Sequence, residues 1–201
     1  MRARKTETEL RQEQIVEAAL ELIGTEGFYA LSITKIAERV GIVPSALYRH
    51  FKSKDDVLDG VLELIKKRLL SNVKHVREQT PDALQRLRLL LMKQAHMLSE
   101  NRAIPHVVFS DGIYTGHPDR KAKVAETITS YLKQIQKIIE EGKQNGTIRQ
   151  DVVPSTASVM FLGMILPAVV LWNVSEGVFD MIAHTEKAWP AFVRCISTKT
   201  E

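Results

Sequence analysis

The stretch SITKIAERVGIVPSALYRHFKSK, Ser32 to Lys54, carries the strongest fold signal in the chain. It holds five Lys or Arg residues and one acidic residue, so its net charge is +4. The rest of the chain holds 23 basic and 23 acidic residues, and the net charge of the whole is therefore also +4. The excess positive charge lies in one short segment, which is typical of a contact with nucleic acid phosphates.

Two short helices joined by a turn are predicted within this segment. Ser32 is a good N-cap for the first helix, and Gly41 suits the left-handed conformation that ends a helix. Pro44 suits the first turn of a second helix, expected over about 44–50, in which Leu47 is the buried residue. Two short helices with a glycine-containing turn between them make a helix-turn-helix.

Longer helices are predicted in the rest of the chain, because apolar residues recur there with helical spacing. They are expected from the capping box of Thr6 to Gly24, over 53–79, from Thr80-Pro81-Asp82 to about 100, and over 118–141, 155–175 and 180–196. Residues 101–118 are expected to be irregular, with one helical turn at 107–111. No convincing strand pattern occurs, so the predicted fold class is all-α.

Two features bear on the cellular setting. Cys195 is the single cysteine, so no intramolecular disulfide can form, and this indicates a reducing, cytoplasmic setting. The 24 residues from Val152 to Ser175 carry no ionisable side chain and are long enough to span a membrane. Pro154, Pro167 and the absence of a flanking Lys/Arg cluster favour a buried helix or a subunit contact instead, so no membrane partner is expected.

Several residues of the opening stretch form a pattern with fixed spacing. They are Ile36, Ala37, Val40, Gly41 and Ile42, followed by Leu47, Tyr48, His50, Phe51, Ser53 and Lys54. This pattern resembles the DNA-binding signature of TetR/AcrR-family transcriptional repressors, over about the first 60 residues. Val43 and Ser45 depart from the residues that the family often has there, so no relative's operator sequence can be carried over.

The resemblance implies an N-terminal three-helix helix-turn-helix DNA-binding domain, residues 1–54, and a larger helical effector-binding and dimerisation domain, 55–201. A helix over 53–79 links them. The implied function is a ligand-responsive regulator, most often a repressor, that binds a palindromic operator as a homodimer. A short helix reads few base pairs, so specificity needs two copies on half-sites about 34–36 Å apart, or a multiple of that. The Met, Phe and Tyr content favours an apolar or aromatic effector, whose identity the sequence does not give.

The DNA-contacting side chains fall into two predicted groups. Small side chains at the start of the second helix are expected to face base edges, because they fit thymine methyl groups and a serine hydroxyl can donate or accept. These base-facing residues are Val43, Pro44, Ser45 and Ala46. Hydroxyl and basic side chains around them are expected to hold phosphates. These phosphate-facing residues are Ser32, Thr34, Tyr48, Arg49, His50 and Lys54. For Tyr48 and His50, which match phosphate-binding positions of the family, simple packing is the alternative.

Two further sites are predicted in the larger domain. An effector pocket, implied by the resemblance, would be lined mainly by apolar side chains with a few polar ones. Its candidates are Met92, His96, Phe109, Tyr114, Tyr131, Phe161 and Met164. A dimer interface is expected on the two last helices. Its candidates are Ile165, Ala168, Trp172, Trp189 and Phe192. Ordinary core packing is the alternative for both sets.

Two rival functions remain open at this point. A structural, nucleoid-type DNA-binding protein would need the basic segment but would leave the apolar helices unexplained. A helical enzyme would need a catalytic motif, and the sequence contains no P-loop, HExxH or GxSxG. His106, Asp111 and His117 have irregular spacing that does not suit a metal site. No enzymatic activity, cofactor or metal is therefore expected.

Overall fold

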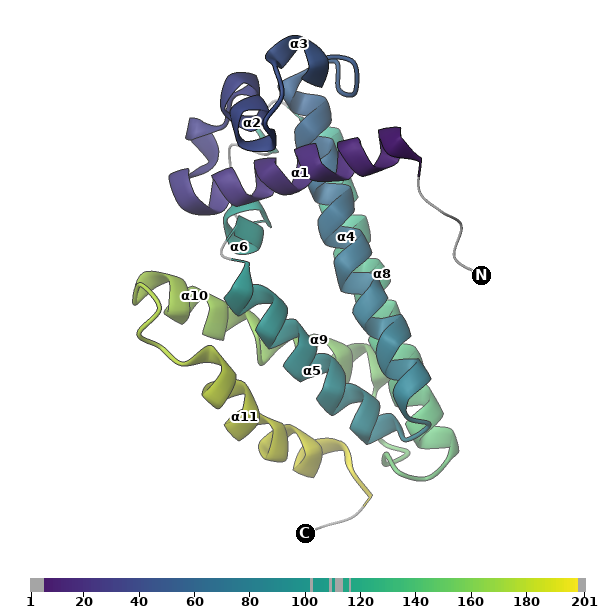
Figure 1. Cartoon of the computed structure of the whole chain (residues 1–201). Helices are drawn as coiled ribbons and strands as arrows, with labels where there is room; N and C mark the ends of the chain where they lie inside the picture. The colour runs from purple at the N-terminus through teal and green to yellow at the C-terminus, as the bar shows by residue number, and fades with distance from the viewer. Residues whose placement is uncertain (1–5, 102, 109, 111–113, 116, 199–201) are drawn as a thin grey trace. The chain divides into compact units, whose positions relative to one another are not determined.

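The computed structural model describes residues 6–101, 103–108, 110, 114–115 and 117–198, and it confirms the all-α fold class (Figure 1). The elements are α1 (Glu7–Glu26), η1 (Phe28–Ala30), α2 (Ile33–Val40), α3 (Pro44–Leu47), α4 (Lys54–Gln79), α5 (Ala83–Glu100), α6 (Ala103–Val108), α8 (Pro118–Gln144), α9 (Pro154–Gly163), α10 (Leu166–Val174) and α11 (Met181–Ile196). The predicted helical turn at 107–111 is replaced by α6, which begins at Ala103.

The chain divides into two compact units, and each unit combines segments that are separate in the sequence. Unit 1 holds residues 1–67 and 101–124, and unit 2 holds 68–100 and 125–201. The helices α4 and α8 each continue from one unit into the other. The predicted boundary after residue 54 separates a DNA-binding domain from an effector-binding domain, and it stays a prediction.

The local signals for the first helices are present in the structure. Thr6 and Glu9 form the reciprocal capping box of α1, with hydrogen bonds of 2.8 and 3.2 Å. Ser32 caps α2, and Gly41 ends that helix in the left-handed region with φ of 76°. The α-helix α3 is shorter than predicted: it ends at Leu47, because the next residues make i→i+3 bonds that tighten the chain into a turn.

The centre of unit 1 is α1, which contacts α2 and α6 on opposite sides (Figure 1). On the first side, Ile23 of α1 and Ile36 and Ala37 of α2 are completely buried. On the other side, the backbones of α1 and α6 come close together, since a Cβ atom added to Gly24 would lie 3.0 Å from the Cβ atom of Ala103. Residues 101–124 therefore complete the fold of the N-terminal helices.

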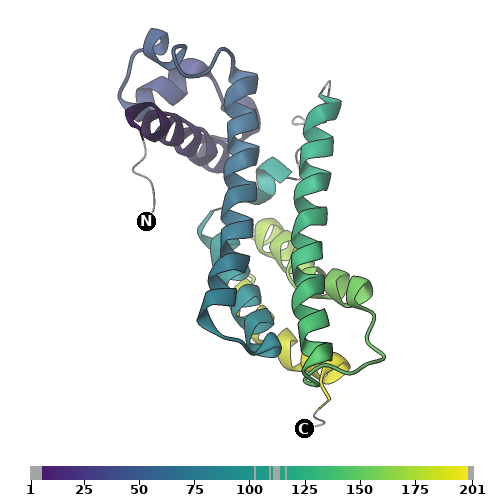
Figure 2. The same ribbon diagram turned by 90° about the vertical axis from the view of Figure 1, so that its right-hand side faces the viewer.

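In unit 2, α11 contacts α5 and α10, and α9 contacts α10. Glu141 of α8 accepts hydrogen bonds from Arg77 at 2.8 Å and from Arg86 at 2.6 Å, which joins α8 to the end of α4 and the start of α5. The end of α11 lies beside the turn that follows α8 (Figure 2), and the Thr198 N–H donates to the carbonyl of Thr147 at 3.2 Å. There Arg149 donates to the carbonyl of Cys195 at 2.8 Å.

The uncharged helix predicted over 155–175 is two helices, and the single-helix prediction is wrong. Pro167 has no N–H to donate to the carbonyl of Gly163, and its ring crowds that carbonyl, so α9 ends at Gly163 and α10 begins at Leu166. The stretch Pro154–Val174 is long and apolar enough to cross a membrane, by length and composition alone, and 33% of its apolar 18-residue window is buried. A single such stretch is weak evidence of a span.

We expect Gly60→Ala to lower the stability of the protein. A Cβ atom there would lie 2.8 Å from Cγ2 of Val16 on α1, and overpacking of this kind costs about 1–3 kcal/mol. The better helix propensity of alanine returns about 1 kcal/mol. Gly163→Ala is the matched control, because nothing lies within 4 Å of its added Cβ. Thermal or urea unfolding should show a lower stability for Gly60→Ala only; equal stabilities would contradict the α1–α4 contact.

Candidate nucleic-acid interface

The helix α3 presents its small side chains outward and anchors itself with one large one. Leu47 is completely buried, whereas Val43 is 63% exposed and Pro44 and Ser45 are exposed. Ala46 is half-buried. The four base-facing residues of the prediction thus lie at the N-cap and in the first three positions of one short helix. Their contacts with DNA stay a prediction.

The predicted phosphate contacts surround α3 on three elements of unit 1. Their exposure differs: Thr34, Tyr48, Arg49 and Lys54 are exposed, and Ser32 and His50 are half-buried. The Ser32 hydroxyl oxygen accepts the Lys35 N–H at 3.2 Å, so its own proton stays available for a phosphate oxygen. The Nδ1 atom of His50 is buried and lacks a hydrogen-bond partner among the described residues, so both packing and phosphate contact remain open for this ring.

Part of the positive charge of the segment is paired within unit 1. Lys35 lies 2.6 Å from Glu26 of α1, and Arg39 lies 3.6 Å from Glu21 and 3.9 Å from Glu26. The hydrogen bond from Lys35 lowers the pKa of Glu26, which keeps that carboxylate ionised. These pairs are exposed and easily screened. They favour the contact between α2 and α1, so the charge directed to DNA comes mainly from the residues that follow α3.

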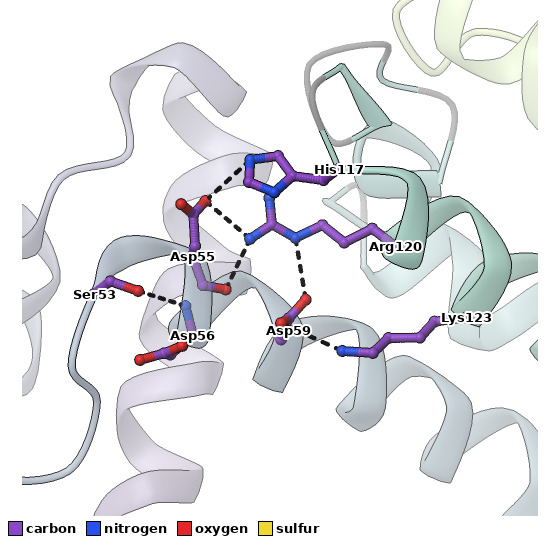
Figure 3. Close-up of polar contacts among 7 residues, drawn as sticks. All are labelled: Ser53, Asp55, Asp56, Asp59, His117, Arg120 and Lys123. Carbon is purple, nitrogen blue, oxygen red and sulfur yellow. Dashed lines mark hydrogen bonds and ion pairs between the residues drawn. The ribbon is translucent and has the colours of Figure 1, made fainter.

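The first turn of α4 is fixed by local hydrogen bonds. Ser53 accepts the Asp56 N–H at 3.1 Å (Figure 3). Asp56 in turn accepts the Lys52 N–H at 3.0 Å. Lys54 is the first residue of this helix and is exposed. The N-terminus of a helix carries partial positive charge, which adds to the charge of the lysine. A phosphate at this end would meet both.

The predicted pocket residues are distributed over both units. In unit 2, Tyr131 and Phe161 are buried and Met164 is half-buried. His96 is exposed, and its Nδ1 atom lies 2.8 Å from the carbonyl oxygen of Met92, which is half-buried.

Two predicted pocket residues belong elsewhere in the chain. Tyr114 lies in unit 1, where its hydroxyl donates to the carbonyl of Val108. Phe109 lies outside the described residues. The remaining candidates for an effector site all lie in unit 2: Met92, His96, Tyr131, Phe161 and Met164.

Three buried polar atoms in unit 2 lack partners among the described residues. They are Nε of Arg77 on α4, Oε1 of Gln94 on α5 and the hydroxyl of Tyr131 on α8. Burial raises the pKa of Tyr131, so its hydroxyl stays protonated and can donate. Sequence analysis missed Gln94, although its position continues the stripe of Leu87 and Leu91 with helical spacing. Buried polar groups are normally hydrogen-bonded, so each of these atoms is a candidate partner for a ligand.

A surface depression of about 270 Å³ lies elsewhere, along α8 alone. It is lined by Ser130, Lys133, Gln134, Gln136, Lys137 and Glu140. Polar side chains of a single helix do not enclose a ligand, so we do not take this depression as the effector site. Among the described residues, no group of three His, Cys, Asp or Glu side chains is placed to hold a metal. Asp111 lies outside that part of the chain.

The predicted dimer residues are mostly turned inward. Ile165, Ala168 and Phe192 are buried within the chain itself, and Trp172 and Trp189 are half-buried. Other apolar side chains of the same region are exposed: Val159, Met160, Leu166, Val170, Leu171 and Val174. These six residues, here called the α9–α10 face, are the part of the region that is open to a second subunit.

Comparisons with known proteins cover both units. A model described as bacterial regulatory proteins, tetR family, matches residues 15–61, and one described as YsiA-like protein, C-terminal region, matches 54–195. A fatty acid metabolism regulator protein of Bacillus subtilis is 25% identical over 92% of this chain and 95% of its own. The nucleoid occlusion factor SlmA of Vibrio atlanticus is 30% identical over 66% of this chain and 71% of its own.

One solved structure shows the same fold along almost the whole chain. The transcriptional regulator FadR from Bacillus subtilis, in complex with stearoyl-CoA, superposes with a TM-score of 0.75 and 24% identity. The match covers 90% of this chain and 97% of that one.

We expect Lys54→Ala and Tyr48→Phe to weaken binding to all DNA sequences alike, because both side chains are exposed and are predicted to hold phosphates. Removing one lysine–phosphate contact should lower the slope of log affinity against log salt by about 1 per half-site. Lys67→Ala, farther along α4, is the matched control for charge. Gel-shift titrations at several salt concentrations measure the effect. A changed base preference in either variant would contradict the phosphate roles.

Proposed function

The chain belongs to the TetR family of bacterial regulatory proteins; it is a DNA-binding, ligand-responsive transcriptional regulator, and we propose that an acyl thioester releases it from its operator. The observation that carries the DNA-binding part is the exposure of Val43 to Ser45 on a helix anchored by buried Leu47. Lys54 follows at the start of α4, which supplies a phosphate contact beside the base-reading helix.

As a member of this family, the protein acts as a homodimer. With four residues, α3 can touch only a few base pairs, so two copies related by a two-fold axis must read a palindromic operator. We propose that the α9–α10 face makes the contact between subunits. Its members are apolar and exposed: Val170 is 51%, Leu171 50% and Val174 77% exposed. Burying such a surface against its own copy would remove it from water.

The proposed effector is suited to an apolar interior with a few polar atoms. An acyl-CoA combines a long apolar chain with a thioester carbonyl, and stearoyl-CoA occupies the similar FadR structure. Tyr131 has a buried hydroxyl with no partner among the described residues. Burial raises the pKa of Tyr131, so the hydroxyl stays protonated. The Tyr131 hydroxyl can donate to the thioester carbonyl, and Phe161 offers apolar contact.

The relatives are transcriptional regulators, and we propose that this chain likewise has no catalytic activity, acts as a repressor and resides in the cytoplasm with its DNA. The similarity to a nucleoid occlusion factor favours a second candidate, a protein that binds DNA without a metabolic effector. That similarity covers 66% of the chain, whereas the fatty acid metabolism regulator matches over 92%. An effector-dependent release from DNA separates the two candidates.

Selection of bound sites from random DNA tests the proposed function. We expect a palindrome with two half-sites, and release of the protein from it by stearoyl-CoA but not by coenzyme A or stearate. Tyr131→Phe should need about tenfold more stearoyl-CoA, the equivalent of one hydrogen bond. Its melting temperature should rise, because an unpaired buried hydroxyl costs about 1–3 kcal/mol.

The exposed Tyr29→Phe is the control for Tyr131→Phe and should match the wild type in both measurements. If Tyr131→Phe released the operator at the wild-type concentration, the role of this hydroxyl would be excluded. If stearoyl-CoA had no effect on the wild type while the palindrome was bound, the effector class would be wrong.

We expect Leu171→Glu to give monomers that bind the operator weakly, because it places a charge in the proposed α9–α10 contact. Leu10→Glu, a similarly exposed leucine on α1, should leave the dimer intact. Size-exclusion chromatography with light scattering gives the mass of each variant. A dimer of Leu171→Glu with unchanged stability would place the subunit contact elsewhere.

A further inference from the structure

A buried arginine holds the first two turns of α4 in unit 1. The side chain of Arg120, near the start of α8, is only 4% exposed. Its Nη2 atom donates to Oδ1 of Asp55 at 2.8 Å and to the backbone carbonyl of Asp55 at 3.0 Å. Its Nε atom donates to Oδ1 of Asp59 at 3.0 Å (Figure 3). One guanidinium group thus fixes both the side chains and the backbone of the helix start.

A lysine and a histidine lie close to the same carboxylates. Lys123 Nζ lies 3.3 Å from Oδ2 of Asp59, and His117 Nε2 lies 3.7 Å from Oδ1 of Asp55 (Figure 3). These five residues, here called the Arg120 cluster, come from α4 and from the segment 117–123. The hydrogen bond from Arg120 lowers the pKa of Asp55, so that carboxylate stays ionised. A buried guanidinium is costly to desolvate, and removal of either partner would leave charge unpaired.

The position of the cluster links it to the DNA-binding residues. Asp55 directly follows Lys54, the residue at the N-terminus of α4 where a phosphate would bind. A phosphate contact depends on the orientation of that turn, because the helix N–H groups and Lys54 must point to the same oxygen atoms. Arg120 also compensates Asp55 and Asp59, two negative charges that would otherwise stand near the phosphates.

We propose that Arg120 is a positioning residue for DNA binding, a role that rests on the proposed function. Through Asp55 and Asp59 it orients Lys54 and the backbone amides at the start of α4. The residue lies 66 positions beyond Lys54 and outside the sequence that resembles the DNA-binding signature. It makes its contribution without touching DNA. The residues that bind the operator are therefore completed by a segment from the second half of the chain.

The helix α8 is joined to α4 at two places along its length. Arg120 and Tyr131 both lie on α8, and Glu141 farther along it pairs with Arg77 of α4 in unit 2. Within each unit, α8 is thus tied to α4 by ion pairs.

The test compares Arg120→Met with Lys121→Met, which removes the same charge from the exposed neighbouring residue. We expect Arg120→Met to bind the selected operator about tenfold more weakly, with a salt slope lower by about 1 per half-site. In the Lys54→Ala background the same substitution should have a much smaller effect, because the two residues act on one contact. A structural role alone would lower the melting temperature but leave the salt slope and this coupling unchanged.

A second variant keeps the test decisive if Arg120→Met does not fold. Asp55→Asn removes a negative charge close to the DNA, so simple electrostatics predicts tighter binding. The positioning role predicts weaker binding, because a neutral amide accepts a weaker hydrogen bond from Arg120 than the carboxylate does, so Arg120 holds the helix start less firmly. Glu63→Gln, an exposed residue on α4, controls for the change in charge. Binding of Asp55→Asn that equals or exceeds that of Glu63→Gln would overturn the proposal. Failure of the wild type to select any operator would instead refute the function on which it rests.

Discussion

The DNA-binding surface depends on the burial of one leucine. A helix of four residues has no stability of its own, because isolated helices shorter than about 12–15 residues are marginal in water. Leu47 is completely buried in unit 1, as are Ile36 and Ala37 of α2, and this packing holds α3 in place. The exposed residues before it and the tyrosine after it take their directions from that anchor. The predicted base contacts therefore depend on apolar packing inside unit 1.

The charges near this surface balance one another across long distances in the sequence. Carboxylates of α1 pair with Lys35 and Arg39, although the sequence places the positive charge in a separate segment. Carboxylates at the start of α4 are paired in turn by Arg120 and Lys123. The net potential at the interface is consequently set by three parts of the chain. A count of charges in the segment 32–54 therefore overestimates its positive charge available to a phosphate, because Lys35 and Arg39 are paired with carboxylates.

The signals that predicted the fold correctly are local ones. Ser32, Gly41 and Pro44 act on neighbouring backbone groups, so their effects can be read without knowing the rest of the structure. The dimer residues could not be chosen in this way, because a helix that is apolar all round has no pattern to show which side is buried. Ile165 and Ala168 proved to be inside the chain. The contact between Arg120 and Asp55 could not be predicted from sequence periodicity, because it joins residues of two helices that are distant in the sequence.

The return of residues 101–124 to the N-terminal helices determines how such a protein can be recombined. Ala103 lies against Gly24, and Arg120 holds Asp55, so the part that reads DNA is assembled from two separate stretches of the gene. A crossover after residue 54 would join helices to partners that had not been selected together. Related chains can exchange this part intact only by moving both stretches at once. If the predicted base contacts of α3 hold, new operator preferences are reached more readily by point substitution there than by exchange of whole segments.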